Sequence, residues 1–358
     1  MDGAQSSSSH SPTAKPTSDA LRMHQQLDRL RTSQHVGEPT ATAPCWCLCR
    51  NAAGMLSQTS GLARAVGLDF EFKFTRLKFP WLCLPEAILP AANFVLRDSA
   101  SFETETPPKL AISCGRHGTI AALALKKKFG DRVFTVHIQD PNMDPARFDL
   151  VVSPKHDRLR GPNVYLSMGA MHYVDDERLA AARKSPEAAL FANDGRPLVA
   201  VLLGGQNNYY GFTKADVEAF IQRLKGFEAA GVRLAFLKSR RTSAEAYQRL
   251  LEEFGERHFV WDGSGANPYF AALALADAVV VTCDSVSMIT EASATGRPVF
   301  VEYMQEQRRA RRFRQLHELF EQAGITRRFD GRLADWTYEI PRDTQRVAQM
   351  IRERIGSL

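Results

Sequence analysis

The sequence predicts an α/β protein of two Rossmann-like domains that face each other over a cleft. Two observations carry this prediction. From Pro44 to about residue 340, apolar runs of strand length alternate with helical stretches, and small or polar residues follow the strands. The stretch from Ala278 to Val301 shows one such unit complete: a β-branched strand, a polar turn at Asp284, a helix that ends at Gly296, and the next strand.

Composition and turn signals predict how the chain is divided. Residues 1–43 are rich in Ser, Thr, Pro and Gln and have too little apolar content to fold, so we expect a disordered extension. A first Rossmann-like domain, expected to hold the acceptor, is predicted over 44–190. A breaker sequence begins at Asn193, and the second, nucleotide-binding domain is predicted over 191–340. Residues 341–358 are predicted to form a C-terminal helix.

Composition also limits the classes of function. The 358 residues are 44% hydrophobic, enough for ordinary cores, and the formal net charge is +6. Five arginines between Arg308 and Arg314 hold much of that excess. Such a run is typical of a solvated helix face, and the alternative is a surface site for membrane lipid or an acidic acceptor. Because no recognised module accompanies the run, no nucleic-acid partner is expected.

The cysteines and the lack of long apolar runs indicate the compartment. Cys45, Cys47 and Cys49 alternate with apolar residues, which places three thiols on one face of a strand with no second ligand pair at a zinc-like spacing. Buried reduced thiols favour a reducing compartment. No stretch has the length of a membrane span, and no signal-peptide core is present, so we expect a cytoplasmic protein, at most peripheral at a membrane.

The turn before the helix of Ser287 predicts a nucleotide site. Ligands of doubly wound sheets bind beyond the carboxyl ends of the strands, where the next helix points its free N–H groups. Ser285 and Ser287 could add donors to a phosphate there. Glu291, four residues beyond Ser287, shares its helical face and could accept bonds from ribose hydroxyls. The alternative is that Ser285 merely caps the helix and Glu291 is a solvated charge.

Three further segments follow predicted strands of the second domain. Gly204 and Gly205 would let the backbone approach a diphosphate. Arg240 and the arginine after it would supply positive charge for the diphosphate. The alternative is that the two are a surface pair without a partner. Asn267 precedes Pro268, where its side chain could contact a ligand or simply cap the next helix.

In the first domain the string Gly-Arg-His-Gly, at 115–118, follows a predicted strand and precedes a predicted helix. We expect a glycine-bracketed turn at which the backbone approaches a ligand. Arg116 could bind a phosphate or acidic group, and His117 could act as a general base near neutral pH. The alternative is that both are turn residues with solvent-facing side chains.

Several strings resemble the mitochondrial fission proteins of the elongated-mitochondria type and their bacterial relatives. They are RNAAGMLSQTSGLARAVGL, GRHG, HIQDP, DLVVSPKHD, LLGG and TCDSVSMITEA, and the resemblance covers about residues 44–340. The family usually has Asp-Gly-x-Ala-Gly-His in its first loop, where this chain has Asn51 and Met55 in place of the glycine and the histidine. The second domain also resembles the donor domain of glycosyltransferases with the two-Rossmann-domain (GT-B) architecture.

The resemblance implies a nucleoside-diphosphate sugar as donor, a glycan or lipid acceptor, and no required metal or other cofactor. It places Asn267 and Tyr269 against the nucleotide base. His117 would be the general base, and Arg116 would orient the acceptor. Two alternatives stay open: a non-enzymatic adaptor that recruits a dynamin-like protein, at the mitochondrial outer membrane in a eukaryote, and a sugar-nucleotide epimerase of the same architecture.

Overall fold

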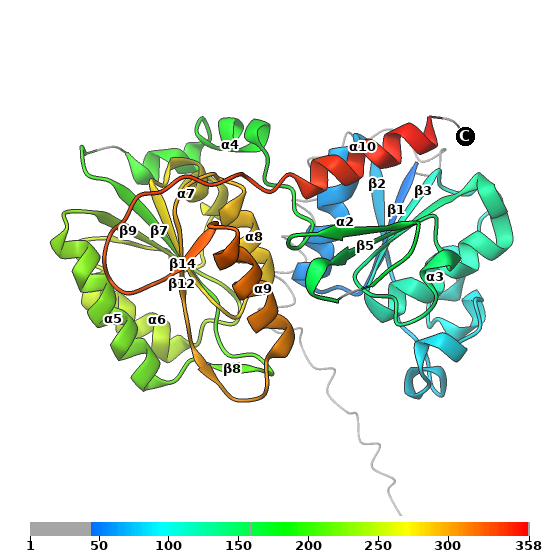
Figure 1. Cartoon of the computed structure of the whole chain (residues 1–358), viewed down its shortest axis with the longest axis horizontal. Coiled ribbons are helices and arrows are strands. Elements are labelled where there is room, and N and C mark those ends of the chain that lie inside the picture. The colour runs from blue at the N-terminus through cyan, green and yellow to red at the C-terminus, as the bar shows by residue number, and fades with distance from the viewer. Residues whose placement is uncertain (1–43, 158, 193, 357–358) are drawn as a thin grey trace, which may run out of the picture. The chain divides into compact units, whose positions relative to one another are not determined.

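The computed structural model describes residues 44–157, 159–192 and 194–356 (Figure 1). The extension predicted over 1–43 lies outside the described residues. Within them the chain forms two six-stranded sheets, each of parallel strands, and a two-stranded antiparallel ribbon, β8 (Tyr210–Gly211) with β13 (Gln305–Glu306).

The first sheet has the strand order β2-β1-β3-β4-β5-β6. Its strands are β1 (Cys45–Cys49), β2 (Phe70–Phe74), β3 (Leu110–Cys114), β4 (Phe134–Ile138), β5 (Leu150–Pro154) and β6 (Val164–Ser167). The helices packed on this sheet include α2 (Ala53–Val66) and α3 (Gly115–Phe129). Because β1, β3 and β4 are buried on both faces, they read as nearly continuous apolar runs, as is typical of parallel sheets.

The second sheet has the strand order β10-β9-β7-β11-β12-β14. Its strands are β7 (Leu198–Leu203), β9 (Arg233–Lys238), β10 (Phe259–Val260), β11 (Ala278–Thr282), β12 (Val299–Glu302) and β14 (Thr326–Arg328). The helices of this part of the chain are α4 (Asp176–Ala182), α5 (Lys214–Ala229), α6 (Ala244–Phe254), α7 (Tyr269–Leu275), α8 (Val286–Ser293) and α9 (Arg311–Gln322). The predicted capping box opens α5, where Thr213 and Asp216 bond each other's backbone N–H.

Each sheet carries an apolar core on both faces. Cys45, Cys47 and Cys49 point into one core of the first sheet, as their alternation predicts, and the intervening Trp46 and Leu48 point into the other. All three thiols are buried and unpaired by disulfides.

The last helix returns to the first sheet. Helix α10 (Asp343–Ile355) packs on α2, and its Val347 and Ile351 join the core beneath β1 (Figure 1). Asp343 at its start accepts hydrogen bonds from the Tyr165 hydroxyl at 2.7 Å and the Met168 N–H at 2.9 Å.

Two helices have other boundaries in the structure than the sequence predicts. The Gly-Arg-His-Gly string is the first turn of α3 and no separate turn, because Gly115 takes a positive φ of 68° and starts the helix directly after β3. The Ala-rich stretch of residues 175–191 predicts a single helix, but the structure has two: α4 ends at Ala182, and a 3-10 helix covers Pro186–Phe191. Pro186 separates the two because it cannot donate a helical hydrogen bond.

Candidate functional site at the sheet switch points

The strand orders fix where ligands should bind. In each sheet the chain first builds outward in one direction and then in the other, so the order reverses between β1 and β3 in the first sheet and between β7 and β11 in the second. Doubly wound folds bind ligands beyond the carboxyl ends of the strands at such switch points. The predicted residues of both domains follow these four strands or the next ones.

At the second switch point, several groups from neighbouring loops bond the side chain of Asp284. Its carboxylate is fully buried and accepts from the Thr282 hydroxyl at 2.6 Å, the Gly205 N–H at 3.1 Å, and Arg241 Nη2 at 2.6 Å. The Asn207 side chain donates to the Asp284 carbonyl at 3.1 Å, which binds the two loops together. These bonds to one buried residue order the loops after β7 and β11.

The close packing around Asp284 requires glycine at positions 204 and 205. A Cβ on Gly204 would lie 2.0 Å from an Asp284 carboxylate oxygen, and one on Gly205 would lie 1.9 Å from the Arg241 carbonyl oxygen. Their N–H groups are already bonded, to the Thr282 hydroxyl at 2.8 Å and to Asp284. The two glycines therefore serve internal packing in this structure, and their predicted contact with a diphosphate stays a prediction.

The two arginines that follow β9 are not equivalent. Arg241 is held by Asp284. Arg240 is exposed and makes no hydrogen bond or ion pair with any of the described residues. Of the two, Arg240 keeps its guanidinium available, and its predicted contact with a diphosphate stays a prediction.

Two of the predicted ligand residues bond the backbone near the start of a helix. Ser285 is the N-cap of α8 and accepts from the Met288 N–H at 3.4 Å. Asn267 is exposed and accepts from the Tyr269 N–H at 3.0 Å, but the N-cap of α7 is Pro268. The capping alternative therefore describes Ser285 and not Asn267, and a contact with a nucleotide remains a prediction for each.

Ser287 and Glu291 share one face of α8, and that face meets α2. A Cβ on Gly54 would lie 3.7 Å from the Ser287 Oγ. The Ser57 hydroxyl donates to Glu291 Oε1 at 3.1 Å, and the Tyr269 hydroxyl donates to Oε2 at 2.6 Å. Each oxygen of Glu291 therefore holds a hydroxyl group, one from the first domain and one from the second.

Glu291 is buried rather than solvated, with 7% of its surface exposed. Burial raises the pKa of its carboxyl group, and the hydrogen bonds from Tyr269 and Ser57 and the field of Arg178 oppose that rise. Arg178 stacks its guanidinium 4.1 Å from the Phe270 ring centre, and its buried Nε has no hydrogen-bond partner among the described residues.

Sequence reasoning missed Ser57 and Arg178. Ser57 lies within the first of the resembling strings, on the helix that follows the altered loop. Because α2 and α8 are more than 200 residues apart in the chain, nothing local to either segment predicts their contact. Arg178 carried no signal at all, since an arginine in an Ala-rich predicted helix is an ordinary surface residue.

The first switch point opens into a cationic hollow of about 460 Å³. It lies where β1 and β3 end. Its walls are lined by Arg50, Asn51, Arg76, Leu77, Leu82, Arg97 and His117. No described carboxylate lies within ion-pair distance of Arg50, Arg76 or Arg97.

His117 faces this hollow as a neutral ring. Its Nδ1 accepts from the Leu77 N–H at 2.8 Å, so the neutral ring carries its proton on Nε2. Burial, followed by the fields of Arg50, Arg116 and Arg76, lowers the pKa of His117 to about 4. In this geometry Nε2 carries the proton and is a potential hydrogen-bond donor, and the predicted role as a general base stays a prediction.

Arg116 turns away from the hollow. Its Nη2 donates to the Leu84 carbonyl and, at 3.3 Å, to the Trp81 carbonyl. Its Nε lies 3.9 Å from a Glu86 carboxylate oxygen. Arg116 thus holds the segment that follows β2 in place, and orienting an acceptor remains a prediction for it.

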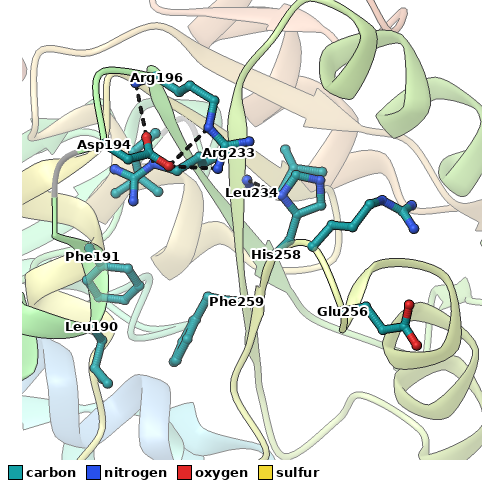
Figure 2. Close-up of a pocket in the computed structure, with 11 residues that line it drawn as sticks. Leu190, Phe191, Asp194, Arg196, Arg233, Leu234, Glu256, His258 and Phe259 are labelled. Atoms are coloured by element: carbon teal, nitrogen blue, oxygen red, sulfur yellow. Dashed lines mark hydrogen bonds and ion pairs between the residues drawn. The ribbon is translucent and has the colours of Figure 1, made fainter.

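A second hollow, of about 320 Å³, lies at the opposite edge of the second sheet (Figure 2). Figure 2 shows Asp194 bridging Arg196 and Arg233, with His258 and Phe259 on the other wall. Leu198 and Arg233 begin β7 and β9, so this hollow is at the amino ends of the strands. We place the ligand site at the carboxyl ends, because strand polarity and helix N-termini favour that edge.

Neither a metal-binding cluster nor a membrane-spanning helix is found among the described residues. Residues 44–157, 159–192 and 194–356 contain no group of three or more His, Cys, Asp and Glu side chains placed to hold a metal ion. In the same part of the chain, no helix is long and apolar enough to cross a membrane.

Comparison with solved structures shows the fold. The UDP-GlcNAc 2-epimerase of Methanocaldococcus jannaschii, solved in complex with UDP-GlcNAc and UDP, matches with a TM-score of 0.50 and 11% sequence identity. The match covers 86% of this chain and 98% of that one. Together with the two parallel sheets, this likeness confirms the predicted GT-B-like architecture of two Rossmann-like domains.

Comparison with other sequences shows the family. The mitochondrial fission protein ELM1 of Arabidopsis thaliana is 29% identical over 284 residues, which is 70% of this chain and 64% of that protein, less than two thirds of its length. Uncharacterized protein RP120 of Rickettsia prowazekii (strain Madrid E) is 24% identical over 338 residues, 84% of this chain and 93% of that protein. The sequence profile described as Mitochondrial fission ELM1 matches residues 53–355. The chain therefore belongs to the mitochondrial fission ELM1 family, as its loop and helix strings predict.

Proposed function

We propose that this chain binds a nucleoside-diphosphate sugar beside α8 and transfers the sugar to a glycan or lipid acceptor. The observation that carries the proposal is the bonding of Glu291, whose two oxygens each hold a hydroxyl group, at 3.1 Å and 2.6 Å. The two hydroxyls of a ribose present the same pair of donors. A bound nucleotide would replace Ser57 and Tyr269 on a carboxylate that is already buried and oriented.

The diphosphate would lie at the start of α8. Partial positive charge gathers at a helix N-terminus, where the first N–H groups have no helical partner. The Ser287 hydroxyl lies there with no hydrogen bond among the described residues, and Arg240 is unpaired. As the sugar leaves, negative charge grows on the diphosphate, and these three groups would stabilise it in the transition state.

On the acceptor side we assign His117 a hydrogen bond from Nε2. With a pKa of about 4 the ring stays neutral at pH 7, and its Nδ1 is engaged by the Leu77 N–H. A neutral Nε2–H can orient an anionic or hydroxyl group of the acceptor. Action as the general base would require the ring to release Leu77 and change tautomer.

The test is calorimetric titration of the full chain with UDP, GDP, CMP and dTDP. We expect selective micromolar binding of one nucleotide, and loss of that binding in Glu291→Ala. Glu318→Ala is the matched control, because Glu318 is exposed on α9 and its variant should bind as the parent does. If folded protein binds none of the four nucleotides, or if Glu291→Ala binds as well as the control, the proposed donor site is wrong.

A non-enzymatic adaptor is the second candidate, and the same bonding favours it. Because Ser57 and Tyr269 satisfy Glu291 internally, the face could serve only to lock α2 against α8. An adaptor would then use its surface, where Arg311 is exposed and unpaired among the described residues and Arg312 lies 3.5 Å from Asp157 with 70% of its side chain exposed. In that case Arg311→Glu would abolish recruitment of a dynamin-like partner, whereas Glu291→Ala would leave recruitment intact.

A further inference from the structure

Three arginines with no acidic partner surround the hollow at the first switch point. Arg50, Arg76 and Arg97 are all exposed, and no carboxylate of the described residues pairs with them. A hollow lined by charges of one sign focuses their field and raises the local concentration of counter-ions, here anions. Guanidinium groups bind phosphate in bidentate geometry, and Nε2–H of His117 adds a neutral donor on the same wall.

Arg76 and Arg97 are placed side by side by the backbone. The Arg97 N–H donates to the Arg76 carbonyl at 2.8 Å, and Leu77 and Leu96 form an isolated antiparallel bridge next to them. The chain between them, which we call the lobe (residues 76–97), leaves the body of the protein and returns to it at this bridge. Arg116 bonds the backbone of the lobe from α3, so the lobe is held in one position.

The lobe also carries exposed apolar side chains. Among the described residues, four of the seven large hydrophobic side chains with high exposure lie in it: Phe79 at 78%, Ile88 at 64%, Phe94 at 54% and Leu82 at 44%. Other apolar residues of the lobe, such as Leu89 and Val95, are buried in the core against α3. These four side chains are therefore not part of the core, and we take an exposed apolar set concentrated in one segment as a candidate interaction site.

We propose that the lobe, with Arg50, is a docking site for a phosphate-bearing lipid in a membrane surface. The arginines suit the anionic headgroup, and the exposed aromatic and aliphatic side chains of the lobe suit the apolar region just beneath it. The two features share one lobe, with Leu82 lining the hollow itself. A free phosphate would engage the arginines alone and would leave Phe79 and Ile88 without a role.

The position of the hollow connects it to the proposed donor site. Arg50 and Asn51 line the hollow, and Gly54 faces Ser287 on α8. Three residues of chain span at most about 11 Å, so a lipid phosphate in the hollow lies within reach of the donor side. As an assignment of the acceptor class this step rests on the proposed function, whereas lipid binding itself does not.

The experiment is co-sedimentation of the full chain with vesicles of phosphatidylcholine alone and of phosphatidylcholine mixed with phosphatidic acid. We expect binding to the mixed vesicles only. Arg76→Gln with Arg97→Gln should weaken it on the order of 30-fold, since each cation near an anionic membrane contributes about a fivefold factor. Arg308→Gln with Arg309→Gln removes the same charge from another exposed segment and should change binding little.

Apolar variants separate a lipid from a free anion. Phe79→Ser should weaken vesicle binding on the order of tenfold or more, because the variant has no ring to bury in the apolar region of the membrane. Leu190→Ser, at a position 50% exposed outside the lobe, is the matched control. Millimolar inorganic phosphate should compete only weakly with vesicles.

Each outcome decides the proposal. Binding lost in the Arg76 and Arg97 variant and in Phe79→Ser, with both controls unchanged, supports it. Loss only in the Arg308 and Arg309 variant assigns membrane binding elsewhere and overturns it. Sensitivity to phosphate together with an unchanged Phe79→Ser indicates a site for a free anion, which also overturns it. Nucleotide titration of the same variants is independent, so failure of the donor site and failure of the lipid site are told apart.

Discussion

The two arginines after β9 allow a sharp test of the second switch point. They are adjacent in sequence, and nothing in the sequence separates them. In the structure Arg241 bonds the buried carboxylate of Asp284 at 2.6 Å, whereas Arg240 makes no bond with a described residue. We therefore expect Arg241→Gln to destabilise the fold, and Arg240→Gln to leave stability unchanged while weakening nucleotide binding.

The magnitude follows from burial. Removing one partner of a fully buried ion pair costs about 3–5 kcal/mol, because the remaining charge is left uncompensated. Asp284 is completely buried, but the Arg241 side chain is 41% exposed, so water already screens the pair. Gly205 N–H and the Thr282 hydroxyl also remain on the carboxylate. We expect a loss of about 2–3 kcal/mol for Arg241→Gln, and less than about 0.5 kcal/mol for Arg240→Gln.

Urea denaturation at pH 7 measures both changes, with the midpoint compared at an unchanged slope. Asp284→Asn provides a further check: in that background the cost of Arg241→Gln should shrink, because no buried charge is left without its partner. Equal stability losses for Arg240→Gln and Arg241→Gln, or full additivity with Asp284→Asn, would refute the reasoning.

Three further predictions concern single groups. Burial raises the pKa of Glu291, so its contribution to stability is present at low pH and is lost as pH rises through the raised pKa. Glu291→Gln should therefore gain stability relative to the parent as pH rises, and a constant difference in urea midpoint would contradict this. Arg76→Gln should raise the pKa of His117 above about 4 in an NMR titration, while that of His137, about 3 and lowered by burial alone, stays unchanged. Gly118→Ala should lower the free energy of unfolding by about 2–3 kcal/mol, because its Cβ would lie 2.2 Å from a carbonyl oxygen of β1, and a smaller urea shift would show that the helix can move away.

Much of the fold could be predicted from the sequence, because parallel strands that are buried on both faces have nearly continuous apolar sequences. The apolar run Leu198–Leu203 predicts a strand with the observed bounds, and every residue of it is buried. Phe70–Phe74, in which aromatic and charged residues alternate, also predicts a strand with the observed bounds, and it lies at the edge of its sheet. The start of α3 was missed because glycines at 115 and 118 suggested a turn, whereas Gly118 is needed where the helix passes close to Leu48. A close approach between distant backbone segments leaves the same glycine as a turn does.

The candidate site could be predicted only in part, because the contacts of each residue depend on distant segments of the chain. Ser287 and Glu291 were found because a helical period of about four residues is local information. What each residue contacts is decided by other segments: Ser57 reaches Glu291 from α2, and Arg241 rather than Arg240 reaches Asp284. Polar residues at strand ends can be recognised from sequence, but which of them are already bonded to the protein cannot.

The segment from Arg50 to Gly54, a short loop followed by the first residues of α2, connects these observations. It begins in the cationic hollow and ends opposite Ser287, so both proposed sites depend on its position. It is also where the chain departs from the family's usual loop string, and Met55 directly after it fills the space beside Gly115 of α3, 2.7 Å from where a Cβ would stand. A glycine in place of Asn51 would give the loop more conformational freedom, and a histidine in place of Met55 would put a titratable group beside Gly115. These departures therefore change side chains next to both proposed sites, while Arg50 and Gly54 stay in place.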